Sequence, residues 1–251
     1  MIPHAQWQAE RLAALTAQDG WLNLTDRVEI QPGPQRVGAG PDNDIVLSVG
    51  PMNLGVLTAT ATTACLTVEG EPEPFAPAGH QGGNPVLRVA GLLLELHTVE
   101  GQPALRVRDL SMRPEVLLPS YPHDPAWVIK ARWEALAAPE AHSVDQKGAG
   151  RTQDVLTHRA HFSHDGAPVT LLATHWKAGK PMFVIRDATS GGETYAASRF
   201  LIGEPEGDTI TLDFNRAHNP PCAFTDFAIC PLPPRENCMA FAIRAGERKP
   251  A

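Results

Sequence analysis

Hydrophobic and polar positions follow a helical period only near the start of the chain. In residues 5–18, Trp7, Leu12 and Leu15 recur near a 3.6-residue period, with alanine and charged residues between them. Gly20 follows as a stop signal. This pattern predicts one N-terminal helix within residues 1–20.

From Trp21 onward, short β-type runs are cut by proline and glycine about every ten residues, as in all-β sandwiches and barrels. The spacing predicts a β-sandwich over residues 21–113. Four prolines in 111–125 break the pattern, which indicates a linker. The runs predicted as strands are VEI, DIVLSV, GVLTAT, CLTVEG, PVLRVAGLLLEL and ALRVRDL.

The alternation resumes after the linker and predicts a smaller antiparallel β-sheet or barrel-like domain over residues 121–251. Asp165-Gly166 lies between two alternating runs and predicts the tight turn of a hairpin. Residues 137–153 are expected to form a loop or long turn. The proline-rich stretch 215–238 is expected to be a long, packed loop, a type that is usually functional when ordered. Further predicted strands are WVIKARWE, MFVIRD, YAASRFLI, TITLDF and MAFAIRA.

Composition narrows the class of protein. Proline and glycine number 24 and 21 of 251 residues, which argues against a protein of long helices. With 43% hydrophobic residues the chain has enough apolar material for a core. No run reaches the roughly 18 apolar residues of a membrane span, and the first residues lack a basic and then apolar leader. We therefore expect a cytoplasmic protein without membrane contact.

Charge argues against a nucleic-acid partner. The net charge is −7, and residues 1–120 carry 7 lysines and arginines against 13 acidic residues. No basic cluster with interleaved aromatic residues is present, so the electrostatic footprint of a nucleic-acid binder is missing.

Metals and cofactors are not expected either. The four cysteines match no zinc spacing and are expected to be reduced. His158, His161 and His164 are three residues apart, so on a strand neighbouring members point to opposite faces, and His158 is expected opposite His175. Motifs for phosphate loops, dinucleotides and nucleophile elbows are absent.

The stretch from GPQRVGAGPDNDIVLSVG to PVLRVAGLLLEL resembles the core of a forkhead-associated domain, a β-sandwich that reads phosphothreonine. Asn43 to Leu47 match the strand after that family's glycine-arginine turn. The phosphate-binding residues do not carry over, because Ala39 replaces the arginine and Gly50 to Gly55 lack the serine and histidine. The resemblance implies the scaffold without the phosphopeptide site.

The back half contains the long motifs IRDATSGGETYAASRFL, DFNRAHNPPCAF and CPLPPRENCMAFAIRAGE. Through these motifs it resembles a bacterial family known only as a domain of unknown function, and the resemblance extends over nearly the whole chain. It implies no activity, so the candidate site must come from the chemistry of the residues.

Two segments are candidates. A Ser/Thr/Gly turn flanked by arginines offers N–H groups, hydroxyls and bidentate donors for a carboxylate or phosphate, or else it is a hairpin loop that caps itself. The second segment has polar residues before two prolines, which fix the backbone and leave either X-Pro bond free to be cis. The candidate ligand-binding residues are Arg186, Asp187, Thr189, Ser190, Tyr195, Arg199, Asn215, Arg216 and Asn219.

These residues leave two functions open. The first is a binding module for a small anionic ligand or a protein partner, with the turn 186–199 and the loop 213–224 joined in one pocket. The second is a hydrolase or transferase with Cys222 as nucleophile and His218 or Asp213 as its partner. In the alternative to catalysis, Cys222 anchors the loop to the core. The sequence leaves open whether there is catalysis, and also the ligand and the oligomeric state.

Overall fold

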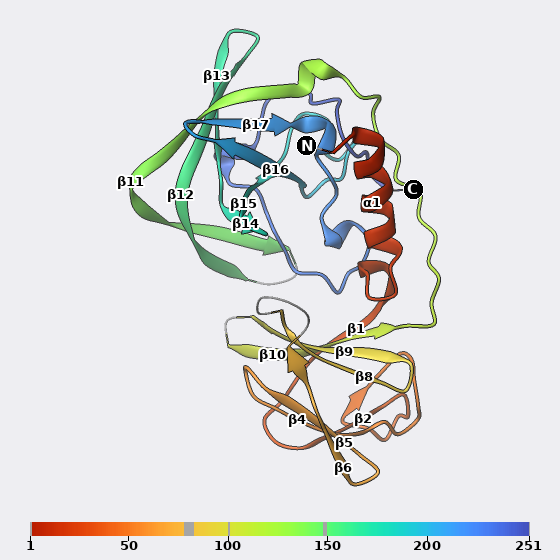
Figure 1. Ribbon diagram of the computed structural model, residues 1–251. Helices are drawn as coiled ribbons and strands as arrows, with labels where there is room; N and C mark the ends of the chain where they lie inside the picture. The colour runs from red at the N-terminus through yellow and green to blue at the C-terminus, as the bar shows by residue number, and fades with distance from the viewer. Residues whose placement is uncertain (1, 78–82, 100, 148–149, 251) are drawn as a thin grey trace. The chain divides into compact units, whose positions relative to one another are not determined.

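The structure is a computed structural model, and it describes residues 2–77, 83–99, 101–147 and 150–250, without the side chain of Lys147. The fold is mainly β, with one N-terminal helix and antiparallel sheets, as predicted (Figure 1). The chain divides into two compact units, Ala13–Glu115 and a larger one made of Met1–Leu12 with Val116–Ala251. No helix among the described residues is long and apolar enough to cross a membrane.

The N-terminal helix α1 spans His4–Thr16, close to its predicted limits. Trp7 and Arg11 lie in the part that belongs to the Val116–Ala251 unit, whereas Leu15 lies in the part that belongs to Ala13–Glu115. Leu15 is buried. The helix therefore contributes side chains to both compact units.

The Ala13–Glu115 unit is a β-sandwich of two sheets. One sheet has the order β1-β10-β9-β8-β7 and the other β3-β2-β4-β5-β6, with only the β2–β3 pair parallel. A 3-10 helix η1 (Trp21–Asn23) leads into the first strand. The strands are β1 (Leu24–Glu29), β2 (Gln35–Gly38), β3 (Ile45–Val46), β4 (Gly55–Ala59), β5 (Ala64–Val68), β6 (Glu71–Pro74), β7 (Ala76–Pro77), β8 (Pro85–Val89), β9 (Leu92–Val99) and β10 (Gln102–Asp109).

Strand alternation builds the core of this sandwich. Leu94 and Leu105 come from the first sheet and meet Leu57 and Leu66 of the second in one buried cluster. All four are fully buried. Because successive strand residues point to opposite faces, the polar residues between these leucines lie on the outer face of the first sheet.

The Val116–Ala251 unit is built on one antiparallel sheet of order β13-β12-β11-β17-β16-β15-β14, and β18 pairs with β11 (Figure 1). The strands are β11 (Val128–Lys147), β12 (Arg151–His164), β13 (Ala167–Leu172), β14 (His175–Lys177), β15 (Lys180–Ile185), β16 (Arg199–Glu206), β17 (Thr209–Asp213) and β18 (Cys230–Pro231). The 3-10 helices are η2 (Pro125–Trp127), η3 (Phe214–Arg216), η4 (Pro221–Ala223) and η5 (Arg235–Asn237).

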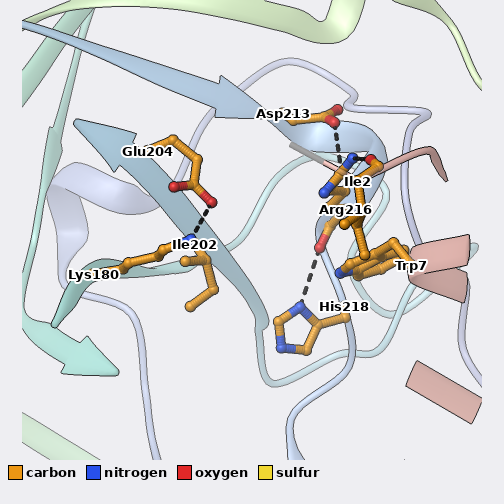
Figure 2. Close-up of a pocket in the computed structure, with 8 residues that line it drawn as sticks. All are labelled: Ile2, Trp7, Lys180, Ile202, Glu204, Asp213, Arg216 and His218. Carbon is orange, nitrogen blue, oxygen red and sulfur yellow. Dashed lines mark hydrogen bonds and ion pairs between the residues drawn. The ribbon is translucent and has the colours of Figure 1, made fainter. Parts of the chain in front are cut away.

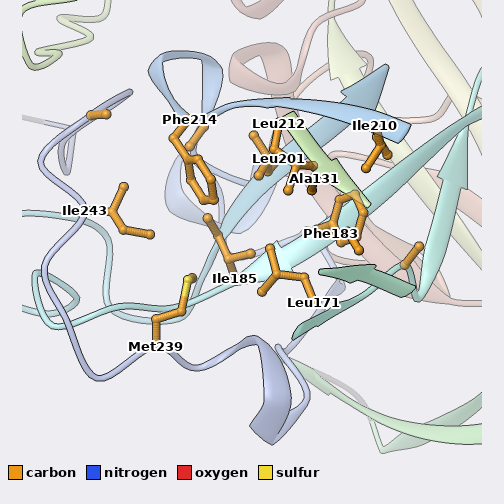
Figure 3. Packing of buried hydrophobic residues seen from close by; sticks show 14 of the residues in the cluster. Ala131, Leu171, Phe183, Ile185, Leu201, Ile210, Leu212, Phe214, Met239 and Ile243 are labelled. Carbon is orange, nitrogen blue, oxygen red and sulfur yellow. The ribbon is translucent and has the colours of Figure 1, made fainter. Parts of the chain in front are cut away.

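Apolar side chains from neighbouring strands of this sheet converge on its core (Figure 3). Phe183 and Leu201 come from β15 and β16, Leu212 from β17, and Phe214 from η3. Ile243 from the C-terminal segment completes the cluster, and all five are fully buried. The loop that follows β17 is thus anchored at its first residue.

The β12–β13 hairpin has the predicted turn. Asp165 and Gly166 both have positive φ, 49° and 77°. This is the pairing of dihedrals that a two-residue hairpin turn of type I′ requires, which explains the Asp-Gly sequence.

The expectation of a loop over residues 137–153 is wrong for most of that range. β11 continues to Lys147, and Glu140 to Asp145 pair with Leu156 to Arg151 of β12. The register shifts between Ala135 and Glu140, where Pro139 lies. A proline cannot donate to a ladder and is tolerated at such an irregularity, so its presence did not end the strand.

The predicted strand MAFAIRA, residues 239–245, is also wrong. The segment buries Met239 and Ile243, but it bends at Ala240 and Phe241 and forms no strand. Met239 N–H donates to the carbonyl of Arg186 at 2.8 Å, and the carbonyl of Phe241 accepts from Ala188 N–H at 3.0 Å. Side chains bond the backbone further along: Ile243 N–H donates to Asp187 Oδ1 at 3.2 Å, and the carbonyls of Ile243 and Ala245 accept from Arg199. The alternation of apolar residues predicted correctly which side chains are buried. It does not show which groups form hydrogen bonds with the backbone.

Candidate functional site

A cavity of about 530 Å³ opens beside strands β15, β16 and β17 (Figure 2). Its lining comes from three parts of the chain that are far apart in sequence: the N-terminal segment with α1, the strands, and the segment after β17. The lining residues are Ile2, Trp7, Lys180, Ile202, Glu204, Asp213, Arg216 and His218.

The strands set the positions of half of this lining. Ile202 and Glu204 alternate with the core-facing Leu201 and Gly203 on β16, so both point to the face that carries the cavity. A Cβ at Gly203 would lie 2.4 Å from Ile210 Cδ1, so close packing on the core side requires glycine there. Packing on the core face of β16 therefore fixes the positions of the residues on its cavity face.

Arg216 lies between Asp213 and His218, beside Ile2, in Figure 2. Its Nε lies 2.9 Å from Asp213 Oδ2, three residues earlier. The buried Nε–H does not form a hydrogen bond, however, because its direction misses that oxygen. One terminal nitrogen donates to the carbonyl of Ile2, which ties the guanidinium to the segment before α1.

Asp213 is held in place by its neighbours. Its Oδ1 accepts from the backbone N–H of Asn215 at 3.1 Å and from Asn215 Nδ2 at 3.0 Å. Asn215 in turn exchanges two 2.9 Å hydrogen bonds with the backbone of Asp124. Asn215 is thus a supporting residue and does not line the cavity.

His218 is a neutral imidazole. Its Nδ1 lies 3.1 Å from the carbonyl of Arg216, and a carbonyl only accepts, so Nδ1 carries the proton. Burial, followed by the positive charges of Arg11 and Lys177, lowers the pKa of His218 to about 3. Nε2 consequently presents a lone pair, on the side of the ring away from Arg216 (Figure 2).

Aromatic rings close the side of the cavity formed by α1. The ring of Trp7 lies 6.2 Å from that of His218, edge to face, and 5.7 Å from the stacked ring of His4. His4 also lies 5.0 Å from His123. Burial and the nearby His123 lower the pKa of His4, so this wall is uncharged at neutral pH.

At the opposite end of the cavity, Lys180 Nζ lies 2.6 Å from Glu204 Oε1. Both side chains are partly exposed. The two cations of the lining, Lys180 and Arg216, are therefore matched by two carboxylates, and the neutral His218 adds no charge.

The polar groups of the turn 186–199 are paired with one another and with the 243–247 segment. Arg199 and Asp187 form an ion pair of 2.7 Å, and both side chains are 1% exposed. Asp187 Oδ1 also accepts from the hydroxyl and the N–H of Thr189. Ser190 Oγ accepts from the N–H of Asp187. These groups satisfy one another and hold the 243–247 segment, and none of them lines the cavity.

The remaining candidate ligand-binding residues lie outside the Arg199–Asp187 ion pair. Arg186 is exposed, and its backbone bridges to Cys238. Tyr195 donates to the carbonyl of Cys222 at 2.6 Å, which is a contact between the turn and the loop. Asn219 is 1% exposed and donates through Nδ2 to the carbonyl of Arg248, while its Oδ1 has no hydrogen-bond partner in the described structure.

Cys222 is 5% exposed. The hydroxyl of Tyr195 lies 3.7 Å from its sulfur, and its N–H donates to the sulfur of Cys230 at 3.3 Å. The described residues contain no cis peptide bond, so both prolines that precede Cys222 follow trans bonds. Cys222 has the surroundings of a residue that anchors the loop.

Of the residues singled out in the sequence, three line the cavity: Asp213, Arg216 and His218. The sequence reasoning missed the other five, Ile2, Trp7, Lys180, Ile202 and Glu204. Trp7 was assigned to a helix with no partner, and the strand residues carried no motif. Only the pairing of β16 with β15 and β17 brings them together, so no local signal identified them.

The expected His158–His175 pair does not form. The carbonyl of His158 accepts from the N–H of Ala173, and the ring of His158 stacks on Trp133 at 4.7 Å. His175 Nε2 lies 3.2 Å from Asp154 instead. Among the described residues, no group of three or more histidine, cysteine and acidic side chains is placed to hold a metal ion.

Comparison with known proteins gives a family and no activity. No curated protein matches the chain. Among solved structures, the chain is similar to an uncharacterised protein of Haloarcula marismortui determined by solution NMR, with 30% sequence identity and a TM-score of 0.44 over 52% of this chain and 75% of that one. A family model matches residues 117–248, which is more than half of the chain. The chain belongs to the family described as "Protein of unknown function (DUF1684)".

Proposed function

We propose that this protein binds a small molecule that carries an anionic group at one end and an amino or other hydrogen-bond donor group at the other. The site is the cavity between Arg216 and Glu204. Its volume of about 530 Å³ lies within the roughly 300–1,000 Å³ of small-molecule sites.

The observation that carries this proposal is the unsatisfied donor of Arg216. Its Nε–H is buried without a hydrogen-bond acceptor, although Asp213 Oδ2 is only 2.9 Å from the nitrogen. A buried donor without an acceptor costs about 1–3 kcal/mol. A ligand carboxylate or phosphate at this wall would accept from the guanidinium of Arg216, which lines the cavity.

The charges of the lining argue for a ligand with both kinds of group. Lys180 and Arg216 are balanced by Glu204 and Asp213, so a purely anionic ligand would have to compete with carboxylates already in place. A donor group near Glu204 adds an attraction that a purely anionic ligand lacks. Between the two ends, Trp7, Ile2 and Ile202 offer apolar surface for the body of the ligand.

The test is ligand-observed NMR with the full chain and three sets of aromatic fragments: carboxylates, amines and amino acids that carry both groups. We expect the amino acids to show the strongest saturation transfer. Arg216→Gln is expected to weaken their binding at least tenfold. Arg151→Gln is the matched control, because Arg151 is an exposed arginine paired with Asp145 in the same unit.

Equal binding of the three fragment sets, or unchanged binding by Arg216→Gln, would contradict the proposal. Trp7→Leu provides a second variant outside the ion pair, because it removes the ring that closes the cavity. Loss of binding in Trp7→Leu together with Arg216→Gln, but not in the control, is the expected pattern.

The enzyme alternative is less well supported. A thiolate nucleophile requires partial exposure and a cationic neighbour. Cys222 is 5% exposed, and His218 is neutral because its pKa is lowered to about 3. Arg216 contacts Asp213 and the carbonyl of Ile2. These features favour binding over catalysis.

For the Ala13–Glu115 unit, we propose a forkhead-associated-like scaffold without a phosphopeptide site. Support comes from the loop that contains Ala39. The N–H of Ala39 donates to the carbonyl of Pro51 at 2.8 Å, and that of Gly40 to Met52 at 2.9 Å. Asn43 Nδ2 also donates to the carbonyl of Met52. The loop donors that a phosphate would need are occupied.

A further inference from the structure

The outer face of the sheet β1-β10-β9 carries an unusual set of buried charges. Leu94 and Leu96 of β9 face the core, so Glu95 and His97 point outward. On β10 the outward residues are Arg106 and Arg108. Pairing of β1 with β10 places Arg27 directly opposite Arg106.

Among the described residues, the positive charge in this cluster exceeds the negative charge by two. Arg106 and Arg108 are 5% and 6% exposed, and they share one carboxylate, Glu95, with distances of 3.3 Å and 2.6 Å. Arg27 is half-buried and forms no ion pair in the described part of the chain. Burial lowers the pKa of His97 to about 4, and Arg106 adds to this effect, so His97 is neutral.

Three nitrogens in this cluster are buried and lack a hydrogen-bond partner in the described structure. They are Arg27 Nε, Arg106 Nε and His97 Nδ1. They come from three adjacent strands, because Arg27 pairs with Arg106 and His97 pairs with Ala104, two residues along β10. Buried polar groups are nearly always hydrogen-bonded, so a set of three next to one another calls for an explanation.

The arginines cannot relieve this by turning to solvent. The Trp21 ring lies against both guanidinium groups. Its centroid is 5.2 Å from Cζ of Arg106 and 5.6 Å from Cζ of Arg108. Arg108 Nε also donates to the carbonyl of Gly20. Asn84 donates to Glu95 Oε1 at 2.6 Å, the same oxygen that Arg106 contacts, and helps to hold the carboxylate.

We propose that this cluster is a binding site for a free tetrahedral dianion, such as phosphate or sulfate, held by Arg27, Arg106 and His97. A charge of −2 cancels the excess of the arginines and Glu95. The oxygens of a tetrahedral ion accept from several directions, which suits donors that approach from three strands. The site lies on the outer face of the β1-β10-β9 sheet and belongs to the Ala13–Glu115 unit, whereas the cavity beside Arg216 belongs to the other unit.

Burial distinguishes the free ion from a phosphate ester. The three nitrogens are inaccessible to solvent, whereas Arg27 and His97 are only half-buried as whole residues. Because the three nitrogens are enclosed, an ion that contacts them is enclosed as well, and the substituent of an ester needs additional space at the same point. Free phosphate is therefore expected to bind more tightly than glycerol phosphate.

The experiment is calorimetric titration of the full chain with inorganic phosphate, sulfate and glycerol phosphate, at an ionic strength held constant with chloride. We expect one site for phosphate and sulfate, and at least tenfold weaker binding of glycerol phosphate. Raising the pH from 6 to 8 should strengthen phosphate binding, because the monoanion loses its second proton, and leave sulfate binding unchanged.

Arg27→Gln is expected to weaken sulfate binding at least tenfold. Arg88→Gln is the matched control, since Arg88 is an exposed arginine of β8 near Asp19. His97→Leu removes the imidazole, which donates to the ion as the Nδ1–H tautomer in this proposal, without a change of charge, and is expected to weaken binding as well. Absence of heat with sulfate in the unaltered chain, or equal affinity in Arg27→Gln and Arg88→Gln, would overturn the proposal.

Discussion

Two aspartates of the Val116–Ala251 unit show how surroundings decide the role of a residue. Asp187 follows β15 and Asp213 is the last residue of β17, and each pairs with an arginine. Asp187 is enclosed with Arg199 and accepts from the backbone of Ile243, so it joins segments of the fold. Asp213 lies at a cavity wall beside Arg216, whose Nε–H has no hydrogen-bond acceptor in the described structure. Residue type alone does not separate these roles.

Stability at mildly acidic pH provides a prediction for His218. Its pKa falls from the ordinary 6.5 to about 3 in the folded chain, so below pH 6.5 the unfolded chain binds a proton that the folded chain does not. The free energy of unfolding should therefore decrease as the pH falls from 6.5 towards 3, by about 1.4 kcal/mol per unit from this residue.

The measurement is urea unfolding at pH 7 and pH 5 of the unaltered chain and of His218→Asn. Asparagine keeps a donor for the carbonyl of Arg216 but does not titrate. We expect a smaller loss of stability between the two pH values for His218→Asn. An equal loss in both proteins would show that His218 is not shielded from protons.

Thiol reactivity separates the two functions proposed for the loop. We expect iodoacetamide at neutral pH to label Cys238 first, because it is exposed, although burial of its sulfur raises its pKa. Cys222 and Cys230 are buried and should react slowly. Mass spectrometry of the peptides gives the order of labelling.

Preferential labelling of Cys222, suppressed in Arg216→Ala, would instead support a thiolate near Arg216 and the enzyme alternative. Unfolding the protein in urea before labelling is the control, since all four cysteines should then react at similar rates.

At the level of elements, local chemistry predicts turns better than it predicts strand partners. The Asp165-Gly166 turn followed from two residues, because few sequences adopt positive φ twice. The strand β11 between Glu140 and Lys147 has little hydrophobic alternation, and it forms because β12 returns beside it. Its stability comes from pairing that no local window contains.

Glycine substitution tests this view of the hairpin. Gly166→Ala places a Cβ in open space but at φ 77°, so only backbone strain opposes it. We expect a loss of about 1 kcal/mol in the free energy of unfolding. Gly150→Ala is the matched control, because Gly150 also faces open space and does not have positive φ. Thermal unfolding of both variants should show a lower midpoint for Gly166→Ala alone.

At the scale of the molecule, the chain builds two separate apolar cores, one for each unit. Each unit can therefore carry its own site. The proposed ligand cavity belongs to the Val116–Ala251 unit, and the buried arginine cluster belongs to the sandwich. Function in either one is expected to survive substitutions in the other.

The forkhead-associated-like scaffold leads to a prediction for the whole chain. A library of phosphothreonine peptides should bind no more tightly than the same peptides without phosphate, because Ala39 supplies no charged donor and the N–H groups of Ala39 and Gly40 are bonded. Fluorescence anisotropy measures both sets. Micromolar binding that is lost on dephosphorylation would contradict this, and Ala39→Arg provides a variant in which a donor is restored.

The sequence by itself determined the mainly β class, the N-terminal helix and the Asp165-Gly166 turn. These features depend on short-range periodicity and on backbone preferences of single residues, which a sequence displays directly. It also singled out Asp213, Arg216 and His218 as candidates, because unusual polar residues lie together in one segment, and these three line the cavity.

Only the tertiary structure decided which polar residues face a cavity and which are enclosed. Arg199 and Arg216 have the same side chain, but the 243–247 segment covers the first, and the second meets Trp7 and Glu204 across a cavity. Strand pairing brings Glu204 there, and α1 brings Trp7. Such contacts join residues almost 200 positions apart, so they depend on how the whole chain packs and leave no trace in local sequence.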